Sequence, residues 1–302
     1  MKKVSIIIPT YNKIERLRLT ICSYIGQTYP KDDFEIIIVA DSSDVGIQEG
    51  LEDYKHNLNV KIIQTSEKGM PRVRNIGAEA AQGEYLGFFD DDVLVSPDYL
   101  KQCMLRMGDK KDTVVRGPVY TLYFLRFFKD PENGVIFPQF EKEVSHDSPL
   151  REYLINAEMV LNDWNKIEKW CTKLNRFERI VEASLNEKDN RQILPWMGLS
   201  GSGVILHKDS FSEVGGYDVE LGKWWGAESI DLGYRLWKAG KTFINNTDVY
   251  TAHMDHPRDE SLAKFNDSFL YVYNKYGDNN ILLIKELIKS NEKISEALKR
   301  VE

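Results

Sequence analysis

The sequence predicts an α/β fold, a doubly wound and mostly parallel sheet with helices on both faces. Short apolar stretches alternate with helical stretches through roughly the first hundred residues, which is the pattern of consecutive βαβ units. The stretch 84–89 is a nearly continuous apolar run after the breaker Gly83, as expected for a strand covered on both faces. The chain has 302 residues, 42% of them hydrophobic and 29% charged, which is enough for one large domain of this kind.

The expected elements follow one another in a regular order. Pro71 stands in the first turn of the third helix, where its missing N–H costs nothing. Ser96, Pro97 and Asp98 supply a cap, a first-turn proline and a first-turn acid for a helix after the fourth strand. The predicted strands are 4–8, 34–39, 60–64 and 84–89, and the predicted helices between them are 13–25, 44–56 and 71–81.

Residues 117–197 differ in composition from the stretch before them. Five aromatic residues interleave with Arg126 and Lys129, and a charged, tryptophan-containing helical stretch follows from about 150 to 185. One interpretation of the aromatic stretch is a buried hairpin or helix face. The other is an acceptor-binding or membrane-surface element, because aromatic and basic side chains together suit sugars and lipid headgroups. The aromatic residues are Tyr120, Tyr123, Phe124, Phe127 and Phe128.

Regular elements resume in the C-terminal part of the chain. A glycine-rich segment at 198–203 leads into a strand at 204–206, and a longer helix spans 228–239. Two terminal helices, within 262–276 and 281–298, carry apolar residues at helical spacing, and we interpret both as packing helices. A peripheral membrane role for the last helix is the alternative.

Charge, cysteine content and the apolar profile restrict the class of protein. A net charge of −7 with a pI near 5.5 gives no general attraction to nucleic acid. Cys22, Cys103 and Cys171 are odd in number and widely spaced, so we expect them to stay reduced in the cytosol. The first strand begins near residue 4, which leaves no room for a signal peptide, and no apolar stretch reaches transmembrane length. We therefore expect a cytoplasmic protein, with the inner face of the membrane as the alternative location.

Three consecutive carboxylates, Asp90, Asp91 and Asp92, follow the fourth strand. Adjacent carboxylates repel one another, and a hard divalent cation held through their oxygens relieves that repulsion. The carboxyl ends of strands in open α/β sheets are also where ligands bind. A solvated acidic turn is the alternative for such a triplet taken by itself. If the strand geometry persists, Asp90 and Asp92 point the same way.

Six segments, in this order and spacing, carry a resemblance to a known family. The segments are Pro-Thr-Tyr-Asn at 9–12, Val-Ala-Asp-Ser-Ser at 39–43, Arg-Val-Arg-Asn-Ile-Gly at 72–77, Ala-Gln-Gly-Glu-Tyr-Leu-Gly-Phe-Phe-Asp-Asp-Asp at 81–92, Gly-Gly-Tyr-Asp at 215–218 and Trp-Gly-Ala-Glu-Ser-Ile-Asp-Leu-Gly-Tyr-Arg-Leu at 225–236. The first four closely resemble the nucleotide-sugar-binding half of family 2 glycosyltransferases, which have the GT-A fold. The last two resemble galactosyltransferase-like and chondroitin-polymerase-like members. The resemblance covers about 1–110 and 198–257.

The resemblance implies metal-dependent transfer of a hexosyl or N-acetylhexosaminyl group from a nucleotide sugar, which we predict to be UDP-linked, with inversion. The acceptor stays open among glycans, lipid-linked sugars, peptides and small molecules. A retaining enzyme and a non-catalytic nucleotide-sugar-binding protein are the alternatives. A nucleotidyltransferase is disfavoured, because the residues after the first strand are not glycine-rich. The implied parts are a nucleotide-sugar-binding half at 1–116, an inserted acceptor-side region at 117–197, an acceptor half at 198–257 and a helical extension at 258–302.

The resemblance also implies the residues of the donor site. Asp41 would accept the imide N–H of uracil, a proton that cytosine lacks, although an Asx-turn is its alternative role. The usual Asp-Asp-Gly-Ser pattern is Ala-Asp-Ser-Ser here, which keeps the base-reading acid and loses its neighbour. Asp90 would face the ribose. The remaining predicted donor-binding residues are Pro9, Thr10, Tyr11, Arg74, Asn75 and Asp91.

Asp92 and His253 are the metal ligands that the resemblance implies, with His256 as a weaker candidate. The ion would be Mn²⁺ or Mg²⁺, and an imidazole ligand favours Mn²⁺. Trp224 and Trp225, between two glycines, suit a mobile lid that covers the sugar and excludes water. Two core tryptophans in a turn are the alternative.

The catalytic base departs from the pattern of the relatives. Inverting members use the Asp of a Glu-Asp pair, and this chain has Ser229 in its place. A serine hydroxyl is not a general base near neutral pH, so we predict Glu228 as the base. Asp231, three residues on, would orient the acceptor or brace the helix through a pair with Arg235. An already acidic acceptor, such as a thiol, would lessen the need for a strong base.

Overall fold

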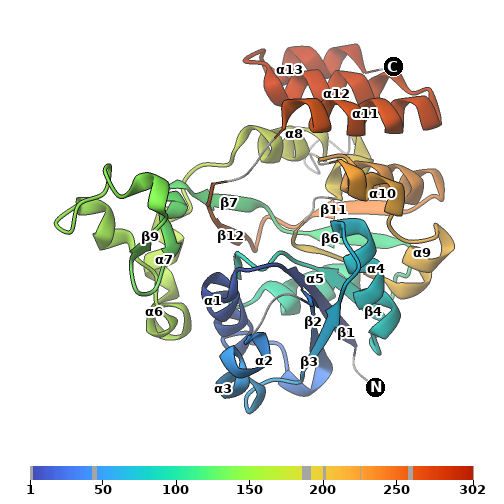
Figure 1. Cartoon of the computed structure of the whole chain (residues 1–302). Coiled ribbons are helices and arrows are strands. Elements are labelled where there is room, and N and C mark those ends of the chain that lie inside the picture. Colours follow the sequence, from blue (N-terminus) through green and yellow to red (C-terminus); the bar gives the residue numbers. More distant parts are fainter. Residues whose placement is uncertain are drawn as a thin grey trace.

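In the part of the chain that the structure describes, seven strands form the central sheet (Figure 1). The computed structural model describes residues 3–42, 46–185, 192–199, 202–224, 226–257 and 261–301. Across the sheet the strands are β11 (Thr242–Asn245), β6 (Thr113–Arg116), β10 (Val204–His207), β4 (Tyr85–Phe88), β1 (Val4–Thr10), β2 (Phe34–Asp41) and β3 (Val60–Thr65).

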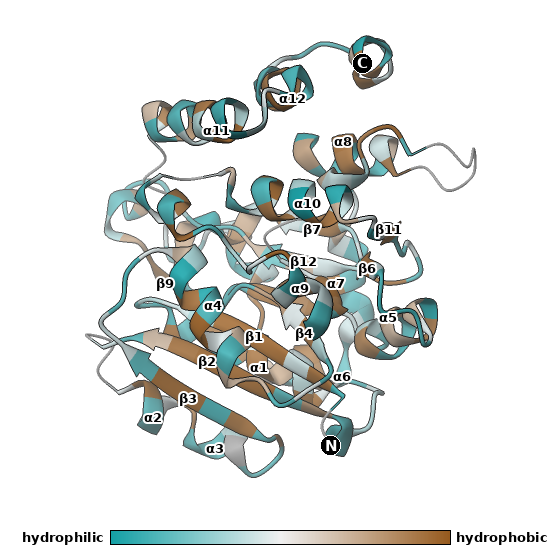
Figure 2. Cartoon of the chain, turned by 90° about the vertical axis from the view of Figure 1, so that its right-hand side faces the viewer, coloured by the Kyte–Doolittle hydropathy of each residue, from teal (hydrophilic) through white to brown (hydrophobic). Residues whose placement is uncertain are grey.

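The sheet is mostly parallel, as the sequence predicts. β1 runs parallel to both β2 and β4, with Ile6 opposite Ile36 and Ile7 opposite Phe88. β10 is antiparallel to β4 and β6, and it joins the N-terminal strands to the C-terminal part of the chain. Every residue of β1 is buried, which explains the apolar runs that also appear in Figure 2.

Two helical layers cover the two faces of the sheet. Helices α1 (Ile14–Ile25) and α5 (Tyr99–Met107) pack on Ile6, Ile8 and Ile36, while α4 (Met70–Ala80) packs on the opposite face with Ile7. Successive side chains of a strand point to opposite faces of the sheet, so the side chains of β1 alternate between the two cores. Gly77 lets α4 approach β1 closely, because a Cβ there would lie 2.4 Å from Cγ2 of Ile7.

A second, small sheet links distant parts of the sequence. It contains β5 (Val93–Val95), β12 (Thr251–Met254) and β7 (Val119–Leu122), with β12 in the middle. β5 follows the three carboxylates directly, and β12 carries His253. The pairing therefore brings residues about 160 positions apart in the chain to one place.

The inserted region forms a lobe beside the main sheet (Figure 1). Its core includes Leu125, Phe128 and Ile167 and is shared with residues of α1, β5 and β12. Tyr123, by contrast, is 52% exposed, so the aromatic stretch is part core and part surface. The elements of the lobe are η2 (Tyr123–Phe127), β8 (Phe128–Asp130), β9 (Val135–Ile136), η3 (Pro138–Phe140), η4 (Pro149–Tyr153), α6 (Ala157–Asn162) and α7 (Trp164–Trp170). The last helix of the inserted region, α8 (Arg176–Ser184), lies apart from the lobe beneath the C-terminal helices (Figure 1), and its Ile180 and Val181 belong to the main core.

The C-terminal helices pack on the rest of the protein, as predicted. α11 (Leu262–Tyr276) and α12 (Asn279–Lys289) bury Phe269, Val272 and Ile284 in the same core as α10 (Glu228–Lys238). The chain ends with α13 (Ile294–Ala297) and η8 (Leu298–Arg300), and Figure 1 shows this stack above α8 and α10. Among the described residues, no helix has both the length and the apolar character needed to span a bilayer.

Several boundaries differ from the sequence prediction. The helix expected at 44–56 is two short helices, α2 (Ile47–Gly50) and α3 (Glu52–Lys55), in the part of it that the structure describes. The fifth helix starts at Tyr99 because the Ser96 hydroxyl accepts from the N–H of Tyr250 and the Asp98 carboxylate accepts from Thr28, so neither caps it. The remaining elements are η1 (Lys31–Asp33), η6 (Pro195–Gly198), α9 (Lys208–Glu213) and η7 (Val219–Lys223).

Candidate active site

The three carboxylates after β4 turn to different partners. The strand ends at Phe88, and Asp91 and Asp92 lie in a turn, so strand alternation does not continue as we expected. Asp91 and Asp92 are buried, whereas the side chain of Asp90 is 30% exposed. Buried carboxylates need a cation or hydrogen-bond donors, and the surrounding residues supply both.

Asp92, His253 and His256 form a cluster with the chemistry of a metal site. One ligand atom from each lies within 4.8 Å of the other two. Nε2 of His256 is 2.9 Å from Oδ2 of Asp92, and Nε2 of His253 is 3.6 Å from Oδ1. Nδ1 of His256 lies 2.7 Å from the carbonyl oxygen of Pro257, which can only accept, so Nδ1 carries a proton and Nε2 is left for a metal. A carboxylate and two imidazoles fit a divalent transition metal such as Mn²⁺.

Backbone pairing between β5 and β12 builds this cluster. Val93 lies opposite His253, and the N–H of Met254 donates to the carbonyl oxygen of Asp92 at 2.8 Å. The turn that holds Asp92 is therefore tied directly to the strand that holds the histidines.

The Lys13 ammonium lies inside the same cluster. Its Nζ is 2.8 Å from Oδ2 of Asp92, 3.3 Å from Oδ1 of Asp91 and 3.0 Å from Nε2 of His256. Burial by itself would lower the pKa of Lys13, but Asp92 and Asp91 outweigh it and raise that pKa. Burial likewise favours a higher pKa for Asp92, yet His253 and Lys13 hold that pKa well below its ordinary value.

Thr10 and Asp91 pair with each other. The Thr10 hydroxyl donates to Oδ2 of Asp91 at 2.8 Å, and both side chains are buried. Burial raises the pKa of Asp91 to about 6, against the opposing effect of Lys13. The pair joins the end of β1 to the turn after β4, and the binding of the donor by these two residues stays a prediction.

Arg74 connects two acids on opposite sides of the site. Its Nη2 donates to Oδ1 of Asp90 at 2.9 Å, and its Nη1 is 3.6 Å from Oε1 of Glu228. The guanidinium also lies 5.3 Å from the ring centroid of Tyr217. Burial would lower the pKa of Arg74, but Tyr217, Asp90 and Glu228 hold it above its usual value. The buried cation thus fixes both carboxylates in place.

Asn75, which we predicted in the nucleoside site, has a structural role. Its Nδ2 donates to the carbonyl oxygen of Tyr217, and its Oδ1 accepts the N–H of the same residue, both at 2.9 Å. Two hydrogen bonds to one backbone unit use both ends of the amide. The place of Asn75 in the nucleoside site stays a prediction. The contact with Tyr217 lies 142 positions away in the chain, and no local pattern reveals it.

Glu228 and Asp231 both lie in the first turn of α10, in different environments. The Glu228 side chain is 17% exposed, and its Oε2 accepts the N–H of Gly226 at 3.1 Å. Asp231 is fully buried and accepts hydrogen bonds from Arg235 in its own helix and, in α11, from Lys275 at 2.8 Å and Tyr276 at 2.7 Å.

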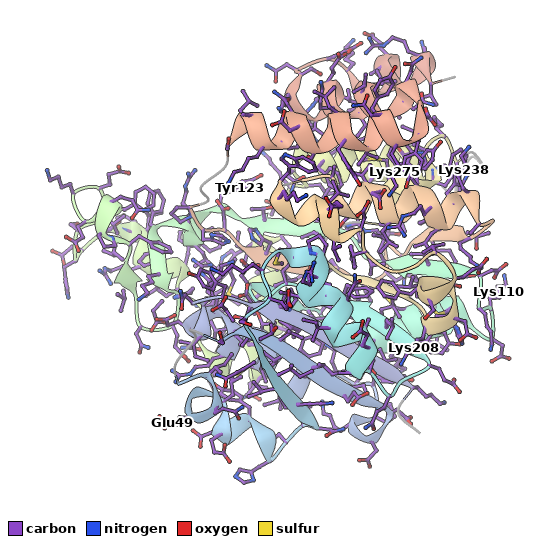
Figure 3. All side chains as sticks on the ribbon, turned by 45° about the vertical axis from the view of Figure 1, so that its right-hand side comes forward. Glu49, Lys110, Tyr123, Lys208, Lys238 and Lys275 are labelled. Atoms are coloured by element: carbon purple, nitrogen blue, oxygen red, sulfur yellow. The ribbon has the colours of Figure 1, made fainter. Side chains whose placement is uncertain are left out.

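Asp231 therefore braces α10 against the C-terminal helices. Figure 3 labels Lys275, which reaches from α11 toward α10. The predicted pair with Arg235 is present, and the suggested contact with the acceptor stays a prediction.

The other predicted donor residues lie around the ends of β1 and β2. Asp41 ends β2 beside β1, where Pro9 is buried and Tyr11 is 61% exposed. The ring of Trp224 lies 5.2 Å from that of Tyr271 in α11 and packs against the core, and its role as a lid stays a prediction. Trp225 lies outside the described residues.

Two residues of the site were missed or ranked too low from the sequence. His256 ranked below His253, although both belong to one short segment that returns to the carboxylates. Lys13 received no role. Its signal was a lysine at the very start of the first helix, three residues after a strand whose neighbour is followed by three acids.

Known structures share the fold of this chain. One is the structure of GalNAc-T7 with UDP, GalNAc and Mn²⁺, which has a TM-score of 0.60 and 19% identity, with coverage of 99% of this chain and 53% of that chain. At that identity the likeness shows the fold alone. The central sheet and its helices are those of the GT-A glycosyltransferase fold, as predicted.

Sequence relatives agree with the fold. An uncharacterized glycosyltransferase named YfnE from Bacillus subtilis (strain 168) is 25% identical over 288 residues, covering 92% of this chain and 71% of its own. Chondroitin synthase from Escherichia coli is 25% identical over 261 residues, covering 85% of this chain and 35% of its own. The chain thus spans a minor part of the longer relative and less than three quarters of the shorter one.

The fold and the carboxylate-histidine site define the class of protein, a nucleotide-sugar-dependent glycosyltransferase. The sequence profile of the family described as glycosyl transferase family 2 matches residues 5–155, half of the chain, and the chain belongs to this family. The resemblance drawn from the motifs is confirmed.

Proposed function

We propose that this protein transfers a sugar from a UDP-sugar to an acceptor, with inversion, and that the reaction depends on a divalent metal. The observation that carries the proposal is the position of two groups of residues. The first group is the metal-ligand cluster of Asp92, His253 and His256. The second group begins at Asp90, close to Asp92 in the chain, and consists of Arg74 with the two acids it pairs with, Asp90 and Glu228. A bound Mn²⁺ would neutralise the charge that builds on the leaving diphosphate.

The donor base would lie at the ends of β1 and β2. Asp41 would accept the imide N–H of uracil, and the exposed ring of Tyr11 is close by for stacking. Asp90 would accept from the ribose, since its side chain is partly exposed and its orientation is fixed by Arg74. GalNAc-T7, which shares the fold, was solved with UDP and Mn²⁺, and this supports a uracil nucleotide here.

Glu228 would act as the general base. Its carboxylate is partly exposed and is held by Arg74 and by the backbone N–H of Gly226, so it has a fixed direction and an accessible oxygen. In the proposed step, Glu228 takes the proton of the acceptor nucleophile as that atom bonds to C1 of the sugar. The bond from C1 to the phosphate oxygen breaks at the same time, on the opposite face, and the configuration inverts.

The acceptor would approach from the side of the inserted region, 117–197. The exposed Tyr123 directly follows β7, the strand that pairs with the histidine-bearing β12 (Figure 3). The halves 1–116 and 198–257 would then serve donor and acceptor, with 258–302 as a helical support.

Metal-dependent nucleotide binding tests this proposal. We expect UDP to bind far more tightly with Mn²⁺ than with excess EDTA, and Asp92→Ala to remove that difference and abolish transfer. His253→Ala and His256→Ala should each weaken both. The matched control is Asp109→Ala, which removes an exposed acid outside the site. Full transfer activity in EDTA would refute metal dependence.

A further inference from the structure

Lys13 contacts the same atoms that a metal would use. Its Nζ is within hydrogen-bond distance of Oδ2 of Asp92 and Nε2 of His256, at 2.8 Å and 3.0 Å. These two atoms are themselves 2.9 Å apart, and a carboxylate oxygen and an imidazole lone pair at that separation need a shared cation or proton. The ammonium supplies that cation in this structure.

The backbone holds Lys13 at this position. Asn12, just before it, has a φ of 53°, and it is the one non-glycine residue with positive φ in the part of the chain that the structure describes. Such a conformation costs energy and persists where the surroundings enforce it. One helical turn later, the buried Arg16 donates to the carbonyl oxygens of Leu125, Phe128 and Met254. Arg16 therefore fixes the start of α1 against the end of β12.

A metal and the Lys13 ammonium are incompatible at this place. A divalent ion binds carboxylate and imidazole at about 2.0–2.2 Å. An ammonium in hydrogen-bond contact with the same two atoms would then lie about 3–4 Å from the ion, where like charges repel strongly in a buried site. Lys13 is 31% exposed at its side chain, so it has a solvent-facing path along which to move.

We propose that Lys13 is an internal counter-cation of the metal site, which yields to the divalent metal when the donor diphosphate arrives to pair with the ammonium. This inference rests on the metal site of the proposed function and adds a positioning residue to it. No covalent bond changes: Nζ leaves Asp92 and His256, and phosphate oxygens accept its hydrogen bonds. Metal and nucleotide then bind cooperatively. The diphosphate draws the ammonium away from the metal ligands, which removes its repulsion of the metal, and the metal frees the ammonium from Asp92 and His256 to pair with the diphosphate.

The coupling is measurable without turnover. Free Mn²⁺ is titrated into the whole protein by electron paramagnetic resonance, with and without UDP. In the wild type we expect UDP to raise Mn²⁺ affinity by a factor in the ordinary range of about 5–150. In Lys13→Gln we expect Mn²⁺ alone to bind about tenfold more tightly, and the factor due to UDP to be smaller than in the wild type, because only the direct attraction between Mn²⁺ and the diphosphate then couples the two. Lys13→Arg should keep much of the coupling, since it keeps the charge.

Lys111→Gln is the matched control, because Lys111 forms an exposed pair with Asp209 away from the site. Unchanged or weaker Mn²⁺ binding in Lys13→Gln without UDP would overturn the inference. If that variant does not fold, the wild type still decides, since equal Mn²⁺ affinity with and without UDP contradicts the coupling. Asp92→Asn separates the two proposals: if Mn²⁺ binds this variant as it binds the wild type, the metal site itself is wrong.

Discussion

Replacing Asp231 by Asn should lower the free energy of unfolding of the protein and leave the kcat of transfer unchanged. Asn keeps the shape of the side chain but removes the charge between Arg235 of α10 and Lys275 of α11. The Tyr276 hydroxyl keeps an oxygen to which it can donate. The change therefore tests the ionic contact between the GT-A core and the C-terminal helices.

The size of the effect follows from burial. Removing one partner of a buried ion pair costs about 3–5 kcal/mol, because the other charge stays behind uncompensated. Asp231 is fully buried, but the side chains of Arg235 and Lys275 are 18% and 31% exposed, so water screens part of the loss. We expect the free energy of unfolding to fall by about 3 kcal/mol.

Urea denaturation, monitored by tryptophan fluorescence, measures this change. The kcat is measured at urea concentrations well below the unfolding transition. Asp278→Asn is the matched control, since Asp278 accepts from the neutral Tyr234 hydroxyl at the same interface and Asn also caps helices well. Its cost should stay below about 1 kcal/mol. If Asp231→Asn keeps wild-type stability and loses kcat a hundredfold, Asp231 faces the acceptor and our interpretation is wrong.

Two further predictions concern donor binding and chemistry. Glu228→Gln should lower kcat by about 10²–10⁴ while the affinity for UDP with Mn²⁺ stays the same; near-normal turnover, or retention of configuration in the NMR spectrum of the product, would remove Glu228 as the base. Asp41→Ala should weaken UDP binding by about 1.5–3 kcal/mol in isothermal titration calorimetry, the value of a hydrogen bond to a charged group. Unchanged UDP affinity would leave Asp41 a turn residue.

The strands of this fold were predictable because burial on both faces produces an apolar run. β1 and β2 each extend two residues beyond the predicted end, and β3 extends one residue beyond it. The helical stretch at 150–185 was less predictable. Within it, Asn156 caps α6 and Asn175 caps α8. In the sequence, the same polar residues fit equally well into one continuous charged helix.

The site was predictable where one segment carries the chemistry and unpredictable where partners come from afar. Three acids after a strand indicate a cation from their own repulsion. The roles of Asn75 and Asp231 depend on partners 142 and 44 positions away, and a carboxylate or amide looks the same in sequence whether it faces a ligand or a backbone. The role of Lys13 was also missed because its partners are distant in the chain. The direction of its side chain depends on the backbone turn at Asn12.

Because β5 pairs with β12, the candidate metal cluster can form only late in the synthesis of the chain. A growing chain that has emerged only as far as residue 240 contains Asp92 but neither His253 nor His256, so it lacks two of the three clustered groups. The segment that matches the family profile ends at residue 155 and lacks them too. Formation of the cluster therefore requires that β12 has already paired with β5.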